Sequence, residues 1–197
     1  MRLDTPTLTG QTIRLTPLTP ECLPELTRAA LCAPEIWQHI PYRVQTEADV
    51  VELLESALAE HALGTRMAFA TRLATSDEMI GGTSFFLTNK SVPTVEIGAT
   101  WIVPAWQRSA VNTEAKLLQL GHCFEVLGCQ RVELKTDIRN LRSRAAITRL
   151  GAREEGILRS HMRRADGSLR DTVMFSIIAA EWPEVRDRLT QRLQSGL

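Results

Sequence analysis

The amino-acid sequence predicts a mixed α/β fold, in which a twisted, mostly antiparallel sheet of six or seven strands carries helices on both faces. Three strand-like segments follow one another through short connections, which permit only antiparallel pairing. Helical and strand-like segments then alternate, as in a βαβ unit. A hairpin signal lies near the C-terminus. No repeat or linker-like run interrupts residues 1–197, so the sequence predicts a single domain.

Composition excludes several classes of protein. Hydrophobic residues make up 44% and charged residues 23% of the 197 residues, which is ordinary globular usage. The 23 basic residues balance the 23 acidic ones, so we expect no nucleic-acid partner. No apolar run predicts a membrane span, and the first ten residues lack a signal-peptide pattern. The four cysteines form no C-x-x-C pair, so we expect a cytoplasmic protein with reduced thiols and no metal.

The first half of the chain is predicted to contain one strand, two helices and a meander of three strands. Alternation of polar and apolar residues predicts the first strand. Thr46 and Asp49 are spaced as a capping box, and Gly64 is positioned to end the helix that they begin. The predicted elements are a strand at 11–15, a helix at 23–31, an irregular segment at 37–42, a helix from Thr46 to Gly64, and strands at 67–73, 79–87 and 94–103, with a turn at 75–78 and a loop at 89–93.

The second half is predicted to contain three helices and three strands. The loop at 104–111 runs directly into a helix, and Gly151 is positioned to end the next one. Ala165-Asp166-Gly167-Ser168 is a strong hairpin signal. The predicted elements are a helix after 111, strands at 131–137, 156–163 and 169–178, and helices at 140–150 and 180–193. The apolar or small face of the helix after 111 is assigned to Leu117, Leu120, Gly121, Phe124, Leu127 and Gly128.

This order of elements resembles the GNAT acetyltransferase superfamily, and most closely its branch of RimJ-type and RimL-type ribosomal-protein acetyltransferases. The resemblance spans about residues 8–193. It is carried by Glu96-Ile97-Gly98, Pro104-Ala105-Trp106-Gln107-Arg108, Asn112-Thr113-Glu114-Ala115-Lys116, Lys135-Thr136-Asp137 with Asn140 and Ser143, and Leu150-Gly151-Ala152. The resemblance implies an acyl-CoA-dependent N-acetyltransferase, with acetyl-CoA as donor and a primary amine as acceptor. We expect a homodimer.

The loop from Gln107 to Asn112 is the predicted pyrophosphate site. Backbone N–H groups at a helix start lack intrahelical partners, and they favour phosphate together with the helix dipole. Arg108 can add charge-assisted contacts. The family pattern Q/R-x-x-G-x-G/A falls on Ala105, Arg108 and Ala110, of which only Ala110 fits; the alternative is an ordinary strand-to-helix turn. The residues predicted to bind the cofactor are Trp101, Ile102, Val103, Gln107, Arg108, Ser109, Ala110, Val111, Asn112, Asn140 and Ser143.

Asn140 is expected to cap the helix at 140–150. The resemblance adds a contact from Asn140 to the pantetheine arm or to the acceptor side. Arg139, Arg142 and Arg144 form a basic cluster beside it. This cluster is either a solvated face or a site for the 3′-phosphate of CoA.

Glu96 is the candidate general base. Acetyl transfer needs a neutral amine, and a primary ammonium is mostly protonated at neutral pH, so a proton acceptor assists. The alternative is a Glu96 that only pairs across strands. The tyrosine that protonates the leaving thiolate in many GNAT enzymes would fall at Ile147, where it is absent. Tyr42 and Ser143 are the candidate acids, although packing is the alternative role of Tyr42. A CoA-binding sensor or dimerisation module without turnover is the alternative function.

Overall fold

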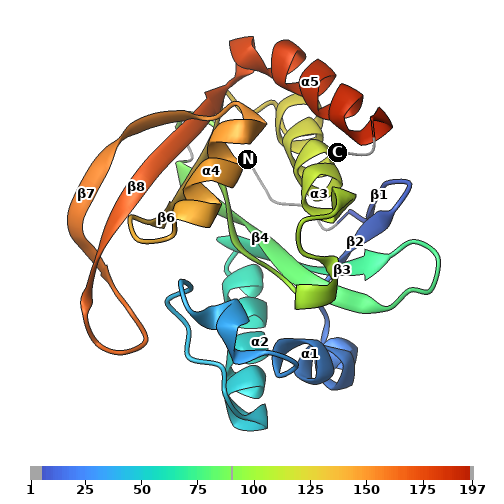
Figure 1. Ribbon diagram of the computed structural model, residues 1–197, viewed down its shortest axis with the longest axis vertical. Helices are drawn as coiled ribbons and strands as arrows, with labels where there is room; N and C mark the ends of the chain where they lie inside the picture. The colour runs from blue at the N-terminus through green and yellow to red at the C-terminus, as the bar shows by residue number, and fades with distance from the viewer. Residues whose placement is uncertain (1–5, 90, 196–197) are drawn as a thin grey trace.

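The computed structural model describes residues 6–89 and 91–195, which form one eight-stranded sheet with helices on both faces (Figure 1). The strand order is β1-β2-β3-β4-β5-β6-β8-β7. Only β5 and β6 pair in parallel, so the predicted mixed and mostly antiparallel sheet is confirmed. The predicted count of six or seven strands is wrong, because β1 has two residues and is too short to leave a periodic pattern.

The elements agree closely with the predicted ones. The strands are β1 (Leu8–Thr9), β2 (Ile13–Pro17), β3 (Arg66–Leu73), β4 (Met79–Asn89), β5 (Thr94–Ile102), β6 (Arg131–Asp137), β7 (Arg153–Arg163) and β8 (Leu169–Ile178). The helices are α1 (Leu23–Ala30), α2 (Glu47–Ala62), α3 (Ala110–Gly121), α4 (Leu141–Leu150) and α5 (Trp182–Gln194). Lys90 of the predicted 89–93 loop, and the first five residues of the N-terminal segment, lie outside the described residues.

Local capping signals are confirmed in detail. Thr46 and Asp49 form the predicted capping box at the start of α2. Gly64 and Gly151 follow α2 and α4 with φ angles of 69° and 99°, in the left-handed region that glycine adopts without a steric penalty. Asn140 caps α4 by accepting a hydrogen bond from the Ser143 N–H at 3.0 Å. Each of these signals is complete within one helical turn, which is why the sequence alone reveals it.

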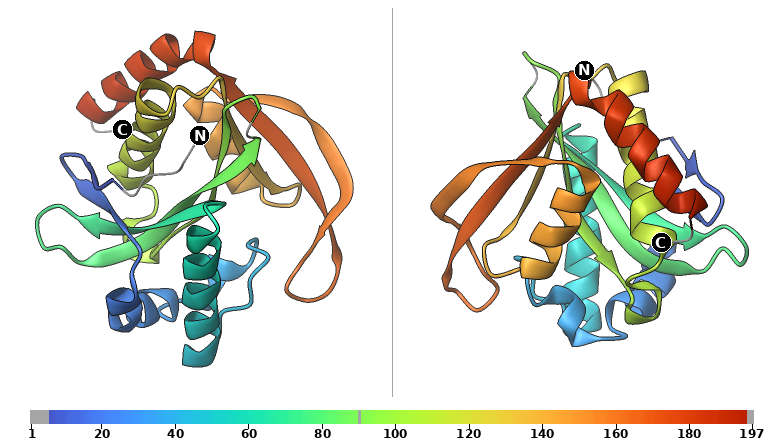
Figure 2. Two further views of the ribbon diagram at one scale, coloured as in Figure 1. Left: turned by 180° about the vertical axis from the view of Figure 1, so that it is seen from behind. Right: turned by 45° about the horizontal axis from the view of Figure 1, so that its top comes forward.

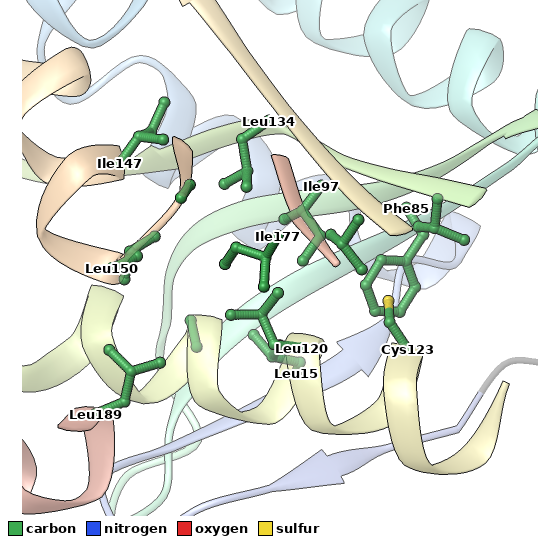
Figure 3. Close-up of a cluster of buried hydrophobic side chains, with 14 of the residues drawn as sticks. Leu15, Phe85, Ile97, Leu120, Cys123, Leu134, Ile147, Leu150, Ile177 and Leu189 are labelled. Atoms are coloured by element: carbon green, nitrogen blue, oxygen red, sulfur yellow. The ribbon is translucent and has the colours of Figure 1, made fainter. Parts of the chain in front are cut away.

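Two hydrophobic cores lie on opposite faces of the sheet. The larger core joins the sheet to α3, α4 and α5 through residues such as Leu15, Phe85, Leu120, Leu150 and Leu189 (Figure 3). The smaller core joins the sheet to α1 and α2, which lie together on the other side (Figure 2). Burying a Leu, Ile or Phe side chain contributes about 1.5–3 kcal/mol. Both faces of the central strands are therefore committed to packing, and polar groups there need specific partners.

The predicted apolar face of α3 packs against the larger core, but polar side chains of the helix are buried as well. Glu114, Lys116 and Gln119 are buried, whereas Leu117 is only half-buried. The helix also continues as a π-helical turn over His122–Val126. Apolar spacing did not reveal these buried polar side chains, because their partners are distant in sequence: Glu114 binds backbone N–H groups, and Lys116 binds threonine hydroxyls.

The β7–β8 hairpin extends beyond the helices and curves toward the side of the sheet that carries α1 and α2 (Figure 1). The segment between α1 and α2 lies on that same side, and both views show it near the tip of the hairpin (Figure 2). The two segments therefore lie close together at one end of the molecule, next to the C-terminal end of β6.

Candidate functional site

Strands β5 and β6 separate from one another along their length. Parallel pairing joins Thr94–Glu96 to Arg131–Glu133, but β5 continues to Ile102 and β6 to Asp137. Within the described residues, the two strands have no further pairing after Glu96 and Glu133. The edge of β5 that faces β6 beyond Glu96 therefore offers backbone N–H and C=O groups to an extended chain with amide groups of its own.

A β-bulge in β5 lies at this opening. Gly98 pairs with Ser84 and Trp101 with Gly82, so Ala99 and Thr100 lie opposite the single residue Thr83. Ala99 has a φ of 48°, in the left-handed region that non-glycine residues seldom adopt. Thr100 consequently points to α3, and Trp101 packs in the core beneath α1 and α2. The bulge thus changes which face of the sheet the end of β5 presents.

Lys116 of α3 forms hydrogen bonds to threonines at the bulge. Its ammonium group donates to Gln119 Oε1 at 2.8 Å, to Thr100 Oγ1 at 3.0 Å and to Thr83 Oγ1 at 3.5 Å. The residue is 4% exposed. Burial lowers the pKa of Lys116 from its ordinary value of 10.5 to about 7.

We expect Lys116→Met to remove a pH-dependent contribution to stability. Because the folded-state pKa of Lys116 is depressed, the unfolded chain binds a proton that the folded chain lacks between about pH 7 and pH 10, so folding is favoured as pH rises. Urea unfolding at several pH values checks this. Across that range, the unfolding free energy of the wild type should increase relative to that of Lys116→Met. The variant also lacks the hydrogen bonds of Lys116, which lowers its stability by an amount that does not depend on pH. Parallel pH curves for the two proteins would contradict the prediction.

The loop between β5 and α3 is built around one residue with an uncommon backbone conformation. Arg108 is exposed and has a φ of 61°. The family pattern has glycine at this position. Arg108 has a left-handed backbone conformation that glycine adopts without a penalty, although the glycine is absent. Ser109 then caps α3: its hydroxyl accepts from the Val111 N–H at 3.3 Å and donates to Trp106 O at 2.7 Å. The other N–H groups in the first turn of α3 have no intrahelical acceptors.

Two substitutions of Arg108 separate its backbone from its charge. Both Arg108→Gly and Arg108→Ala remove the guanidinium group, but only glycine adopts a φ of 61° without a penalty. We expect Arg108→Gly to be the more stable of the two by about 1 kcal/mol. Both variants should bind CoA more weakly, and by the same factor. Urea unfolding and calorimetric titration with CoA measure the two effects; equal stability of the variants would contradict the strained conformation.

The N-terminal ends of α3 and α4 lie on either side of the opening. Gln107 connects them: its Nε2 donates to Ile102 O at 2.8 Å, and its Oε1 accepts from Arg142 Nη1 at 2.8 Å. The predicted basic cluster is divided, because Arg144 pairs with Glu154 at 3.2 Å on β7. Two positive helix ends and Arg142 therefore face the space beyond the end of β5, an arrangement that suits a pyrophosphate group.

The predicted cofactor residues fall into two groups. Those around the opening are brought together: Gln107, Arg108, Ser109, Ala110, Val111 and Asn112 lead into α3, and Asn140 with Ser143 begins α4. On β5, the side chain of Trp101 packs against Trp37, with ring centroids 5.2 Å apart, and is not directed at the opening. The side chains of Ile102 and Val103 also pack against the core. We therefore expect these three residues to contact a ligand chiefly through their main chain.

Glu96 lies where pairing between β5 and β6 ends. It is 5% exposed, and its Oε2 is 2.8 Å from Lys135 Nζ on β6. Gly98 keeps the adjacent space open, since a Cβ there would lie 2.7 Å from Glu96 Oε1. The cross-strand pair expected as the alternative to a catalytic base is therefore present. The carboxylate also borders the opening, so the geometry is compatible with both roles.

Tyr42 lies on the far side of Trp101 from the larger core. It lines a small cavity of about 30 Å³ with Trp37, Arg66 and Trp101. Burial raises the pKa of the Tyr42 phenol, so the group stays protonated and able to donate. Its packing role, expected as the alternative, is present.

Sequence reasoning missed a charged cluster at the end of β6. Asp137 is 1% exposed and accepts a bidentate pair of hydrogen bonds from Arg164, at 2.6 and 3.1 Å. Burial alone would raise the pKa of Asp137, but Arg164 and the Arg139 N–H hold it below its ordinary value. Arg170 lies nearby on β8, and His39 of the segment between α1 and α2 is within electrostatic reach. The alternation of polar and apolar residues in β8 could have revealed this cluster, because Arg170 and Thr172 share the face of the strand opposite to Val173.

A parallel strand pair that separates between two helix N-termini can accept an extended ligand that carries amide and phosphate groups. Comparison with known proteins agrees. The acetyltransferase (GNAT) domain family matches residues 12–153, and the chain belongs to this family. It is an N-acetyltransferase, and enzymes of this family use acetyl-CoA. No curated protein matches the chain.

Solved structures give the same result. A candidate acetyltransferase from T. thermophilus is 35% identical, with a TM-score of 0.88 over 98% of this chain and 100% of that one. A GCN5-related N-acetyltransferase from Brucella melitensis is 28% identical, with a TM-score of 0.90 over 98% of this chain and 87% of that one. Mycobacterium smegmatis RimJ in complex with CoA-disulfide is 23% identical, with a TM-score of 0.79 over 95% of this chain and 91% of that one, and shares the fold.

Two other properties concern only the described residues. Across 6–89 and 91–195, no three His, Cys, Asp or Glu side chains are grouped so as to hold a metal ion. In the same part of the chain, none of the helices combines the length and the apolar character needed to cross a membrane.

Proposed function

We propose that this enzyme transfers an acetyl group from acetyl-CoA to a primary amine, either a protein N-terminus or a small-molecule amine, by direct attack. The observation that carries the proposal is the end of β5–β6 pairing at Glu96, which leaves an unpaired strand edge between the N-termini of α3 and α4. The pantetheine amides then pair with the main chain of Trp101, Ile102 and Val103. The pyrophosphate binds the Gln107–Asn112 loop, and Asn140 and Ser143 lie along the arm.

The reaction needs three groups at the end of that arm. Glu96 takes a proton from the ammonium, directly or through water, and the neutral amine attacks the thioester carbonyl. Backbone N–H groups near the bulge at Ala99 stabilise the negative charge that develops on the carbonyl oxygen. The carbon–sulfur bond breaks, and the thiolate takes a proton from Tyr42, Ser143 or water. Because burial raises the pKa of Tyr42, its phenol is protonated at neutral pH but is a weaker acid than an exposed tyrosine.

The proposal is tested by release of free CoA thiol from acetyl-CoA with a panel of amines, alongside calorimetric titration with CoA. We expect binding and acceptor-dependent release. Binding without release on any amine would instead favour the sensor. Absence of binding would contradict both functions. A cytoplasmic location, a homodimer and a single domain over residues 1–197 remain predictions.

A further inference from the structure

Arg170 is a buried guanidinium group without a partner. It is 4% exposed, and within the described residues its side chain has no hydrogen bond and no carboxylate within 4.0 Å. Nε of Arg170 is fully buried without an acceptor. An unpaired charge in that position is strongly destabilising, so proteins seldom keep one without a use.

Neighbouring groups do not neutralise Arg170. Two carboxylates act on Arg170 through space, but Asp137 already accepts hydrogen bonds from Arg164 and from the Arg139 N–H, and Glu96 pairs with Lys135. Burial lowers the pKa of Arg170, and Asp137 acts on it only through space. Each of these two carboxylates is thus paired with another cation, Arg164 or Lys135, and Arg170 has no carboxylate of its own within ion-pair distance among the described residues.

A second buried polar group lies beside it on the same face of β8. Thr172 is 0% exposed, and its hydroxyl has no hydrogen-bond partner among the described residues. Residues two apart on a strand share a face. Val173, Phe175 and Ile177 pack in the larger core, so Arg170 and Thr172 lie on the opposite face, which also carries α1 and α2.

Glu96 is on that face as well. Its neighbours in sequence, Val95 and Ile97, belong to the larger core, and Glu96 is close enough to Arg170 to affect its pKa. The proposed base and the unpaired cation therefore lie on one face of the sheet, within electrostatic reach of each other, and His39 is within reach of the same cation. The expected pyrophosphate site is elsewhere, at the N-terminus of α3.

We infer that the acceptor is a primary amine that also carries a carboxylate, and that Arg170 and Thr172 bind this carboxylate while the amine lies at Glu96. A guanidinium group matches a carboxylate in geometry, and the hydroxyl of Thr172 supplies one more donor. This inference rests on the proposed function and specifies its substrate class. The carboxylate can belong to a free amino acid or to an acidic residue next to a peptide N-terminus.

The test compares acceptors that differ only in charge. Acetylation of α-amino acids is measured against their carboxamides, and acetylation of dipeptides with an acidic second residue against the matching amides. We expect the wild type to prefer at least one carboxylate series by about tenfold or more in kcat/KM. Arg170→Gln should bring that preference close to one, and Thr172→Val should lower it several-fold, with the KM for acetyl-CoA unchanged. Arg159→Gln, at an exposed position on the same hairpin, should leave the preference intact.

Thermal stability distinguishes a ligand-binding role of Arg170 from a structural one. A structural role predicts that Arg170→Gln lowers the melting temperature. If Arg170 serves the ligand, Arg170→Gln should melt at or above the wild-type temperature, because a buried unpaired charge is removed. An N-acetyl amino acid should raise the melting temperature of the wild type more than its amide does, and should lose this advantage in Arg170→Gln.

The outcomes separate the inference from the proposed function. Amine acetylation without carboxylate preference would overturn the inference and leave the function standing. A raised KM for acetyl-CoA in Arg170→Gln would assign the cation to the cofactor and also overturn it. If no amine is acetylated, the proposed function fails, and the melting-temperature comparison alone decides whether a carboxylate site exists.

Discussion

Glu96→Gln is expected to lower kcat by about a hundredfold or more at neutral pH, in the range found for loss of a general base. The loss should shrink as pH approaches the pKa of the amine, because the acceptor is then neutral without assistance. Affinity for CoA should change little, since the carboxylate lies at the acceptor side of the opening. Initial rates from about pH 6 to pH 10 with one amine measure this.

Lys135→Met distinguishes a base from a residue that only pairs across strands. Lys135 Nζ is 2.8 Å from Glu96 Oε2, so both substitutions break the same ion pair. If the pair alone matters, Glu96→Gln and Lys135→Met should lower turnover and stability to a similar extent and leave the shape of the pH–rate profile unchanged. If Glu96 is the base, Glu96→Gln removes its limb from the pH–rate profile, whereas Lys135→Met keeps that limb and moves it to higher pH, because the carboxylate has lost the cation beside it. An unchanged profile in Glu96→Gln removes the residue from the mechanism.

Glu114→Ala is expected to reduce the free energy of unfolding by about 3 kcal/mol or more. The Glu114 carboxylate is 5% exposed and accepts three backbone hydrogen bonds, from Gln11 at 2.7 Å and from Thr12 and Ile13 at 2.9 Å. Alanine would leave these N–H groups between β1 and β2 without their acceptor. Urea unfolding measures the loss, and a change below about 1 kcal/mol would show that water replaces the carboxylate.

Substitution of Gly10 is a second way to disturb the hydrogen bonds that the Glu114 carboxylate accepts. A Cβ on Gly10 would lie 2.5 Å from Glu114 Cδ, so Gly10→Ala should displace the carboxylate and destabilise the folded state. Once Glu114 is alanine, the same change at Gly10 meets no obstacle. A double-mutant cycle should therefore show strong coupling between the two positions. Additive effects would mean that Gly10→Ala acts through the backbone instead.

Helix α3 consequently joins three parts of the molecule. Its N-terminus follows the loop at Gln107–Ser109, Glu114 binds the backbone before β2, and Lys116 binds Thr100 at the bulge in β5. The Asn112–Lys116 run, which carried part of the family resemblance, has a structural explanation in these last two contacts. Substitutions at Glu114 or Gly10 should affect the proposed acceptor site only through the bulge in β5.

Much of the fold could be predicted because its signals are local. The Thr46–Asp49 capping box, the Asn140 cap and the hairpin at 165–168 each involve residues a few positions apart. The strand β1 was missed because two residues carry no period. The buried polar residues of α3 were missed because their partners are distant in sequence: Glu114 and Gln11 are 103 positions apart.

The sequence by itself determined the order of the elements, the loop that leads into α3 and the resemblance to acetyl-CoA-dependent enzymes. Only the tertiary structure decided that β5 and β6 separate after Glu96, that Glu96 pairs with Lys135, and that Arg170 is buried without a partner. The reason is physical. Propensity and capping act within a few residues, whereas the worth of a charge depends on which distant groups and how much water surround it.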